Sequence, residues 1–276
     1  MTVSLTAIQM RSKPDVMANL VDIEQQLSEL DITEQHLVLL PECCLYFGGK
    51  DKDQLSLAHD AHMFEAMIEG LAHLAQTFGV YLTAGSVPMA SPVADKFTNA
   101  SLVIDPQGQV IADYQKLHLF DVEVADSEKN YRESRYTQAG RKVVNCALPF
   151  ANLGLTICYD LRFPELFRQL TENGADIITV PAAFTRVTGK AHWQSLLQAR
   201  AIENQVYIMA AGQEGIHANG RETWGHSMII NPWGEVLTTI DQGVGAVTAT
   251  FEPEFLQEVR RNIPVAQHNR FTTELI

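Results

Sequence analysis

The stretch GLTICYDLRFPELFR, residues 154–168, carries the clearest local pattern of the chain. Alternating apolar residues predict a strand over Leu153–Cys158, and a proline suited to a first helical turn predicts a helix over Pro164–Glu172. A tight turn between strand and helix exposes a nucleophilic side chain and aims a following backbone N–H at the same point. Cys158 is therefore a candidate nucleophile, and a nearby helix N-terminus would favour its thiolate. The alternative is a buried core cysteine.

Outward from this stretch, short apolar runs alternate with amphipathic ones along the whole chain. Two hairpins and several strand–helix–strand crossovers predict an α/β fold with mixed sheets, and no linker or repeat interrupts residues 1–276, so we expect one domain. The predicted helices are Asp15–Leu30, Phe64–Phe78, His192–Asn204 and Pro253–Asn262. The predicted strands are Val3–Met10, His36–Leu40, Val80–Val87, Ile177–Val180, Val206–Ala211 and Gly245–Phe251, with hairpins Ala100–Asp105/Val110–Tyr114 and His226–Asn231/Glu235–Thr239.

Composition excludes several classes of function. The formal charge is −13, which argues against binding nucleic acid or an anionic membrane surface, because both need clustered lysine and arginine. The N-terminus lacks the pattern of a signal peptide, and no apolar run approaches the roughly 20 residues that span a bilayer. We therefore expect a cytoplasmic protein with four reduced cysteines. The histidines and cysteines show no metal-binding spacing, so we expect neither a metal nor another cofactor.

Two further charged residues follow predicted strands. Glu42 comes just after the apolar run LVLLP at 37–41, and Lys116 follows the second strand of the first hairpin, in the apolar setting of Leu117 and Leu119. Ligand and catalytic residues of α/β sheets gather at such strand ends. An amide carbonyl needs a nucleophile, a proton shuttle and a cation for the developing oxyanion, which Cys158, Glu42 and Lys116 supply in that order. A loop carboxylate and an exposed lysine are the alternatives.

These motifs resemble the nitrilase (carbon–nitrogen hydrolase) superfamily over nearly the full length of the chain. The resemblance rests on LPECC at 40–44, YQKLHLFD at 114–121, YRES at 131–134, the stretch 154–168 and GHSMIINPWGEV at 225–236. It implies a four-layer α-β-β-α sandwich, with two mixed sheets and the helices outside, that pairs into an eight-layer homodimer. It also implies a Glu42–Lys116–Cys158 triad, Glu133 beside the lysine, and an oxyanion hole from Lys116 and the Tyr159 N–H. We expect a homodimer or a higher homo-oligomer, and the C-terminal helix and tail, 252–276, are predicted to cross a dimer interface because the tail is polar for a core element.

Within that superfamily, the sequence is most similar to amidases that act on deaminated glutathione, a small 2-oxo acid amide, through a thioester on the cysteine. The expected products are 2-oxoglutarate and cysteinylglycine, and Arg221 with its neighbours favours this branch. Arg162 is predicted to bind the substrate carboxylate as a bidentate fork, and Thr188 to touch the same group. The alternative for Arg162 is an ion pair with Glu165 or Asp160, and for Thr188 a loop cap.

Two other readings stay open at this point. An ω-amidase acting on 2-oxoglutaramate would use the same three residues and release ammonia instead. A catalytically silent binding protein on the same fold is the alternative from another class. A serine hydrolase is disfavoured, because Gly225-His226-Ser227-Met228-Ile229 lacks the final glycine of G-x-S-x-G and falls in a hairpin strand.

Overall fold

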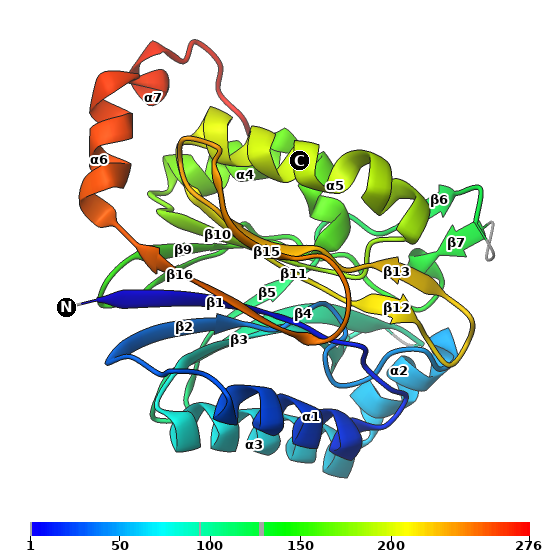
Figure 1. The fold of residues 1–276 in the computed structure, drawn as a ribbon. Helices are drawn as coiled ribbons and strands as arrows, with labels where there is room; N and C mark the ends of the chain where they lie inside the picture. The colour runs from blue at the N-terminus through cyan, green and yellow to red at the C-terminus, as the bar shows by residue number, and fades with distance from the viewer. Residues whose placement is uncertain (1, 94, 127–129) are drawn as a thin grey trace.

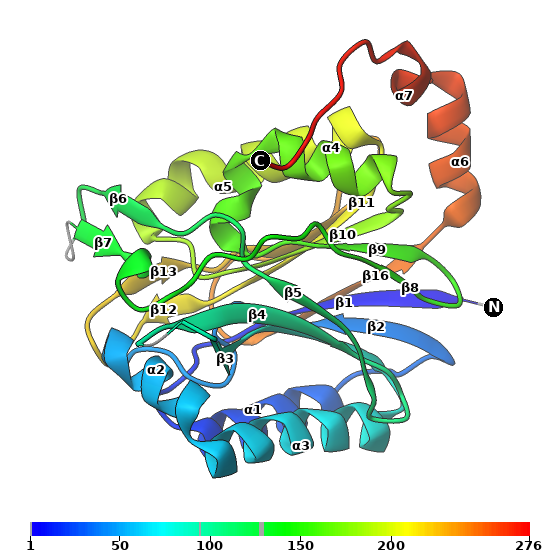
Figure 2. The same cartoon turned by 180° about the vertical axis from the view of Figure 1, so that it is seen from behind.

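A computed structural model describes residues 2–93, 95–126 and 130–276. Two six-stranded sheets pack face to face and helices cover their outer faces, which gives the four layers α-β-β-α (Figure 1). The fold predicted from the sequence is therefore confirmed. Seen from behind, the same layers run from α1 and α3 at one side to α4 and α5 at the other (Figure 2).

The first sheet has the strand order β16-β1-β2-β3-β4-β5. Strands β1, β2 and β3 are parallel, whereas β16, β4 and β5 join antiparallel, so the sheet is mixed as predicted. Its strands are β1 (Val3–Gln9), β2 (Gln35–Leu39), β3 (Tyr81–Ala90), β4 (Phe97–Ile104), β5 (Val110–Gln115) and β16 (Gly245–Phe251).

The second sheet repeats this plan, with the order β15-β14-β11-β10-β9-β8 and a parallel centre of β9, β10 and β11. The outer strands again pair antiparallel. Its strands are β8 (Asn145–Ala147), β9 (Asn152–Leu155), β10 (Ile177–Ala182), β11 (Tyr207–Gly212), β14 (Ser227–Ile230) and β15 (Val236–Ile240).

Two helices cover each sheet. Helices α1 (Val16–Ser28) and α3 (Ala61–Phe78) lie on the first sheet, and α4 (Pro164–Glu172) and α5 (Arg186–Asn204) on the second. Asp15 and Asp60 cap the first pair by accepting backbone N–H groups. The remaining elements are α2 (Asp51–His59), β6 (Asp121–Glu123), β7 (Asn130–Arg132), the 3₁₀ helices η1 (Glu133–Arg135) and η2 (Cys158–Arg162), β12 (Glu214–Ile216), β13 (Glu222–Trp224), α6 (Pro253–Asn262) and α7 (Val265–His268).

The apolar core has two large parts that correspond to the layers, beside a small cluster of Leu55, Ala58 and Phe97. One fills the space between the sheets and continues under α4 and α5, where Trp193 and Tyr207 are almost fully buried. The other lies between the first sheet and helices α1 and α3. Every residue of β1 is buried, because this strand lies inside the first sheet with covered faces on both sides. The two sheets therefore form one continuous packing unit.

Most boundaries differ from the sequence prediction by one to three residues, and two of the differences lie next to the candidate site. Strand β9 ends at Leu155, so Cys158 lies in η2 rather than at a strand end. Helix α5 begins six residues before the predicted His192, because the Thr185 hydroxyl caps its first turn and Gly189 packs tightly against Trp224. The run RVTGKA has too few apolar residues to signal a helix.

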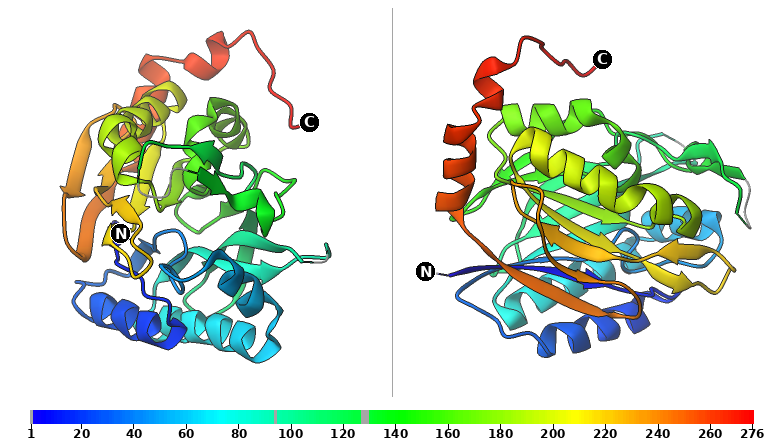
Figure 3. Two further views of the ribbon diagram at one scale, coloured as in Figure 1. Left: turned by 90° about the vertical axis from the view of Figure 1, so that its right-hand side faces the viewer. Right: turned by 45° about the horizontal axis from the view of Figure 1, so that its top comes forward.

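The C-terminal segment lies along one edge of the sandwich (Figure 3). This segment contains helices α6 and α7, and the bounds of α6 agree with the predicted Pro253–Asn262. The Gln169 side chain donates to the Thr273 carbonyl at 2.7 Å, which brings the final residues back against α4. Among the described residues, no helix is both long and apolar enough to cross a bilayer.

Candidate active site

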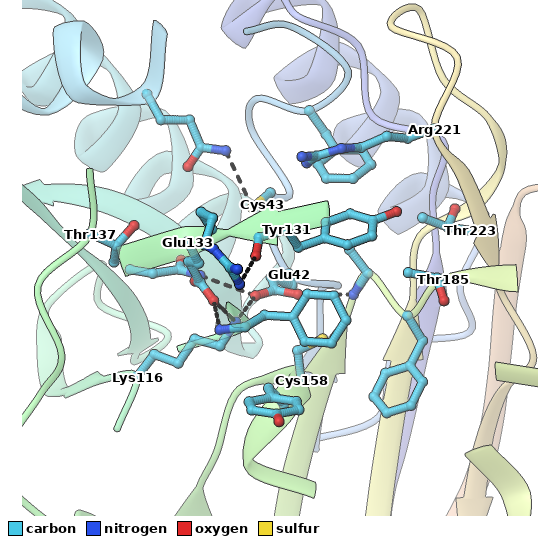
Figure 4. Close-up of a pocket in the computed structure, with 18 of the residues that line it drawn as sticks. Glu42, Cys43, Lys116, Tyr131, Glu133, Thr137, Cys158, Thr185, Arg221 and Thr223 are labelled. Carbon is cyan, nitrogen blue, oxygen red and sulfur yellow. Dashed lines mark hydrogen bonds and ion pairs between the residues drawn. The ribbon is translucent and has the colours of Figure 1, made fainter. Parts of the chain in front are cut away.

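The predicted catalytic residues converge at one end of the sandwich, where the parallel strands of both sheets end. Glu42 follows β2 and Lys116 follows β5, so both come from the first sheet. Cys158 follows β9 and Ala183 follows β10, so both come from the second. Figure 4 shows the side chains of Glu42, Lys116 and Cys158 around one cavity. The site therefore lies across the junction of the two sheets.

Lys116 is the cation of the site. Its ammonium donates to Glu42 Oε1 at 2.8 Å and to the two oxygens of Glu133 at 3.0 and 2.9 Å. Only 2% of its side chain is exposed. Burial alone would lower the pKa of Lys116, but the charges of Glu133 and Glu42 outweigh burial and raise this pKa well above its ordinary value. The lysine is therefore charged, and it is paired rather than solvated.

Glu133 lies where the sequence prediction places it, beside the lysine. It begins η1 and also accepts the Phe120 N–H at 2.7 Å, which fixes the carboxylate from a second direction. Burial raises the pKa of Glu133, against the lowering effect of Lys116. The residue thus holds the ammonium in place together with Glu42 (Figure 4).

Glu42 has a different partner on each carboxylate oxygen. Oε1 accepts Lys116 and the Asn99 side-chain amide at 3.1 Å, whereas Oε2 accepts the Ala183 N–H at 3.0 Å. Beyond the effect of burial, the Cys158 thiol is close enough to this carboxylate for the negative charge of Glu42 to raise its pKa. Two donors fix one oxygen while the other side of the group faces the sulfur. This is the arrangement that a general base for the thiol requires.

Cys158 adopts the left-handed backbone conformation, with φ of 49°. This conformation costs a non-glycine residue about 1–2 kcal/mol, and it occurs where a sharp turn presents a nucleophile. Burial, followed by the negative charge of Glu42, raises the pKa of Cys158 well above its ordinary value, although Lys116 and the Ala183 N–H lower it. The expectation of a favoured thiolate is therefore wrong for the resting site. The sulfur keeps its proton, and a neighbouring base must remove it.

The residue after the nucleophile contributes its backbone. Tyr159 is in the first turn of η2, where N–H groups have no carbonyl partner within the helix. Its side chain packs edge-on against Phe120 and Phe163. The Tyr159 N–H and the Lys116 ammonium are the two donors that the sequence analysis assigned to an oxyanion.

A cavity of about 130 Å³ opens above these groups, and Cys158 is part of its lining. Its floor is polar, its walls are mostly aromatic, and two arginines, Arg132 and Arg221, contribute positive charge. The aromatic lining consists of Phe47, Phe97, Phe120, Tyr131, Tyr136, Tyr159 and Phe184. Such a mixture of apolar walls and a few convergent polar groups is typical of a small-molecule site.

The two predicted substrate-binding residues differ in their placement. Thr188 lines the cavity, near the N-terminus of α5, and bonds to the Thr185 hydroxyl at 2.9 Å. Arg162 is not among the lining residues. It closes η2 and turns toward α5, where its guanidinium meets His192 Nδ1 at 3.3 Å and the Phe184 ring at 5.4 Å. In this structure Arg162 lies outside the cavity lining, and its contact with a substrate carboxylate stays a prediction.

Sequence reasoning missed two donors to the base. Asn99 is on β4 with only 4% of its surface exposed, but it precedes the predicted strand Ala100–Asp105 and lies in a stretch that also contains Thr98 and Ser101, so no pattern marked it. The Ala183 N–H carries no side-chain signal at all.

Cys43 also lines the cavity, but burial raises its thiol pKa far above the ordinary value. Among the described residues, no cluster of three His, Cys, Asp or Glu side chains could bind a metal.

Comparison with known proteins decides the family. Residues 4–261 match the family described as carbon-nitrogen hydrolase. The chain belongs to the carbon–nitrogen hydrolase family. The matched range includes Glu42, Lys116, Glu133 and Cys158.

Relatives of this carbon–nitrogen hydrolase cover almost the whole chain. Deaminated glutathione amidase of Yersinia enterocolitica is 42% identical over 99% of this chain and 95% of its own. The protein of the same name from Rattus norvegicus is 36% identical over 95% of this chain and 80% of its own. The crystal structure of the NitFhit protein of Caenorhabditis elegans superposes with a TM-score of 0.91 at 34% identity, over 100% of this chain and 67% of that one.

Proposed function

We propose that this carbon–nitrogen hydrolase is an amidase that cleaves deaminated glutathione into 2-oxoglutarate and cysteinylglycine. The observation that carries the proposal is the convergence of Cys158, Glu42 and Lys116 in the lining of one cavity, with the Lys116 ammonium donating to the Glu42 carboxylate at 2.8 Å. Relatives that bear the name deaminated glutathione amidase support the choice of substrate.

Acylation begins with proton transfer from Cys158 to Glu42, and the sulfur attacks the amide carbon. The charge that forms on the carbonyl oxygen is stabilised by Lys116 and by the Tyr159 N–H, and each such donor contributes about 3–4 kcal/mol. Glu42 then gives its proton to the leaving nitrogen, the C–N bond breaks, and cysteinylglycine departs as a neutral amine. A thioester between Cys158 and the 2-oxoglutaryl group remains.

Deacylation repeats these steps with water. Glu42 accepts a proton from the attacking water, and the oxyanion returns to the same two donors. Collapse of the tetrahedral intermediate breaks the C–S bond, and Glu42 returns the proton to the sulfur. Because Asn99, Lys116 and Ala183 hold the carboxylate of Glu42 in one place, the same group serves both half-reactions.

Arg221 is the residue that we assign to a substrate carboxylate. It lines the cavity, and its guanidinium lies over the Tyr131 ring at 5.3 Å. The N-terminus of α5, with Thr185 and Thr188 in the lining, adds the positive end of a helix dipole. An acyl group that ends in a 2-oxo carboxylate fits a cavity with this charge.

The test compares deaminated glutathione with 2-oxoglutaramate by kcat/KM. Both substrates give the same 2-oxoglutaryl thioester and differ only in the leaving group, so kcat can be equal while kcat/KM separates them. We expect deaminated glutathione to be preferred and the thioester to be found on Cys158 by mass spectrometry after acid quench. Preference for 2-oxoglutaramate would assign an ω-amidase instead.

Three variants complete this test. Cys158→Ala should have no measurable turnover, whereas the matched control Cys146→Ala, a buried thiol on β8 outside the cavity lining, should keep it. Arg221→Gln should raise KM more than it lowers kcat. Turnover in Cys158→Ala would contradict the assignment of the nucleophile.

A further inference from the structure

Asp160 is a buried carboxylate that the proposed reaction does not use. It lies in η2, two residues after the nucleophile, and none of its surface is exposed. Oδ2 accepts the Tyr114 hydroxyl at 2.7 Å and the Ile157 N–H at 2.8 Å. Oδ1 accepts the His118 N–H at 3.1 Å and lies 2.7 Å from His118 Nδ1. Because burying a carboxylate is costly and Asp160 does not line the cavity, we expect it to have a role within the protein.

The partners of Asp160 come from two distant segments. Tyr114 and His118 stand two residues before and two residues after Lys116, on the first sheet and the loop that leaves it. Ile157 directly precedes Cys158, in the segment that leaves the second sheet. One carboxylate therefore joins the segment that carries the ammonium to the turn that carries the sulfur and the Tyr159 N–H.

We propose that Asp160 is a positioning residue that fixes the two oxyanion donors, the Lys116 ammonium and the Tyr159 N–H, relative to each other. This proposal rests on the amidase reaction described above. The two donors belong to different sheets, so small movements between the sheets would change the space between them. Three of the four hydrogen bonds of Asp160, those with Tyr114 and His118, cross that junction, and the fourth fixes the carboxylate to the Ile157 N–H beside the nucleophile.

The surroundings of Asp160 make this connection rigid. The Tyr114 hydroxyl also accepts the Leu117 N–H at 3.2 Å, so it is fixed both as a donor to Asp160 and as an acceptor. The His118 ring stacks on Phe163 with centroids 3.6 Å apart and planes 5° apart. Phe163 in turn meets the Tyr159 ring edge-on at 5.3 Å. The aromatic stack thus continues from the carboxylate to the residue that provides the second donor.

Asp160→Asn is an unusually specific perturbation of this network. Each carboxylate oxygen accepts one backbone N–H, from Ile157 at Oδ2 and from His118 at Oδ1. A backbone N–H cannot reverse its direction. Whichever way the asparagine amide turns, its NH₂ group must face one of these N–H groups, so one connection breaks although the side chain keeps its size.

The matched control is Asp176→Asn. Asp176 directly precedes β10, at the end of the second sheet that is opposite to the cavity. It accepts the Asn152 N–H at 3.1 Å and pairs with Arg260 at 2.9 Å. Like Asp160, it joins two segments through backbone and side-chain donors, but it has no place at the cavity. The control therefore reports the loss of a structural carboxylate without disturbing the oxyanion donors.

The experiment measures kcat per active site, with sites counted as Cys158 alkylated by iodoacetamide. Its second readout is inhibition by 5-oxopentanoate, an aldehyde that adds to the Cys158 thiol and places its oxygen on the oxyanion donors. We expect Asp160→Asn to lower kcat and to weaken inhibition, each roughly 100-fold, with a smaller change in KM. Asp176→Asn should leave both values near those of the unchanged protein.

Equal behaviour of the two aspartate variants would overturn the proposal. If Asp160→Asn does not fold, Tyr114→Phe removes one donor from Oδ2 and should lower kcat roughly tenfold; an unchanged kcat and inhibition would then refute the role. Failure of the amidase assignment is recognised separately, as turnover in Cys158→Ala or absence of turnover in the unchanged protein. The aldehyde measurement still tests Asp160 in the second case.

Discussion

Replacement of Lys116 by methionine tests the charge balance of the site. Methionine has nearly the same length but no charge, so the variant leaves the carboxylates of Glu42 and Glu133 buried without the ammonium that both contact. Breaking a buried ion pair by removing one partner costs about 3–5 kcal/mol. We expect the free energy of unfolding at pH 7.5, measured by urea denaturation, to fall by this amount.

The loss of stability should depend on pH in a definite direction. Burial and the neighbouring Glu42 raise the pKa of Glu133, and Lys116 opposes them, so removal of the lysine raises the carboxyl pKa further above the unfolded value. Between those two pKa values the folded variant binds more protons than the unfolded chain, and its stability therefore decreases as pH rises. The deficit relative to the unchanged protein should be smaller at pH 5 than at pH 7.5.

Activity and two matched variants complete the test of Lys116. Loss of one oxyanion donor lowers kcat by about 10²–10³. The double variant Lys116→Met/Glu133→Gln should regain part of the stability without regaining activity, because it buries one carboxylate fewer. Lys13→Met removes an exposed ion pair with Asp22 and should cost less than about 1 kcal/mol. A Lys116→Met protein as stable as the Lys13→Met control, with kcat within tenfold of normal, would refute the reasoning.

Two further perturbations concern stability and the approach to the site. Burial lowers the pKa of His36 and of His217 to about 4. Between pH 6.5 and pH 4 the unfolded chain therefore binds more protons, and the free energy of unfolding falls as pH falls. From pH 7 to pH 5 we expect a loss of about 2 kcal/mol per histidine, and His36→Gln should remove the part of the loss that His36 causes. A urea denaturation series with no such slope would contradict this. A Cβ on Gly85 would lie 2.0 Å from the Leu40 carbonyl oxygen and 2.1 Å from that of Pro41, so Gly85→Ala should cost about 1–3 kcal/mol and lower kcat by moving Glu42. Thermal unfolding and kcat unchanged from the parent would rule out this close packing.

The sequence predicts the strands and helices with strong periodicity, and it predicts which residues meet at the catalytic floor. Helices α4 and α6 and strand β16 have the predicted bounds, because prolines and clear alternation mark their ends. Helix α2 and the small pairs β6–β7 and β12–β13 were not predicted, since each is short and polar and is formed by tertiary contacts.

The substrate side of the site was harder to predict than the catalytic floor. Arg162 is close to Cys158 in sequence, but the direction of its side chain depends on the 3₁₀ helix η2, which no local sequence pattern predicts. Arg221 reaches the cavity from the hairpin that ends in β13, far along the chain, and only the packing of the second sheet brings it there. The protonated state of Cys158 likewise depends on burial, which is a property of the folded cavity.

The division of the catalytic groups between two sheets has a mechanical consequence. Acid and amine belong to one half of the sandwich and sulfur to the other, and the Ala183 N–H and the Gln213 side chain reach across to Glu42. The turnover rate therefore depends on the relative position of the two sheets more strongly than spectroscopic signals of secondary structure do. A shift of one sheet by about 1 Å would lower the rate roughly 100-fold while every strand and helix stayed intact.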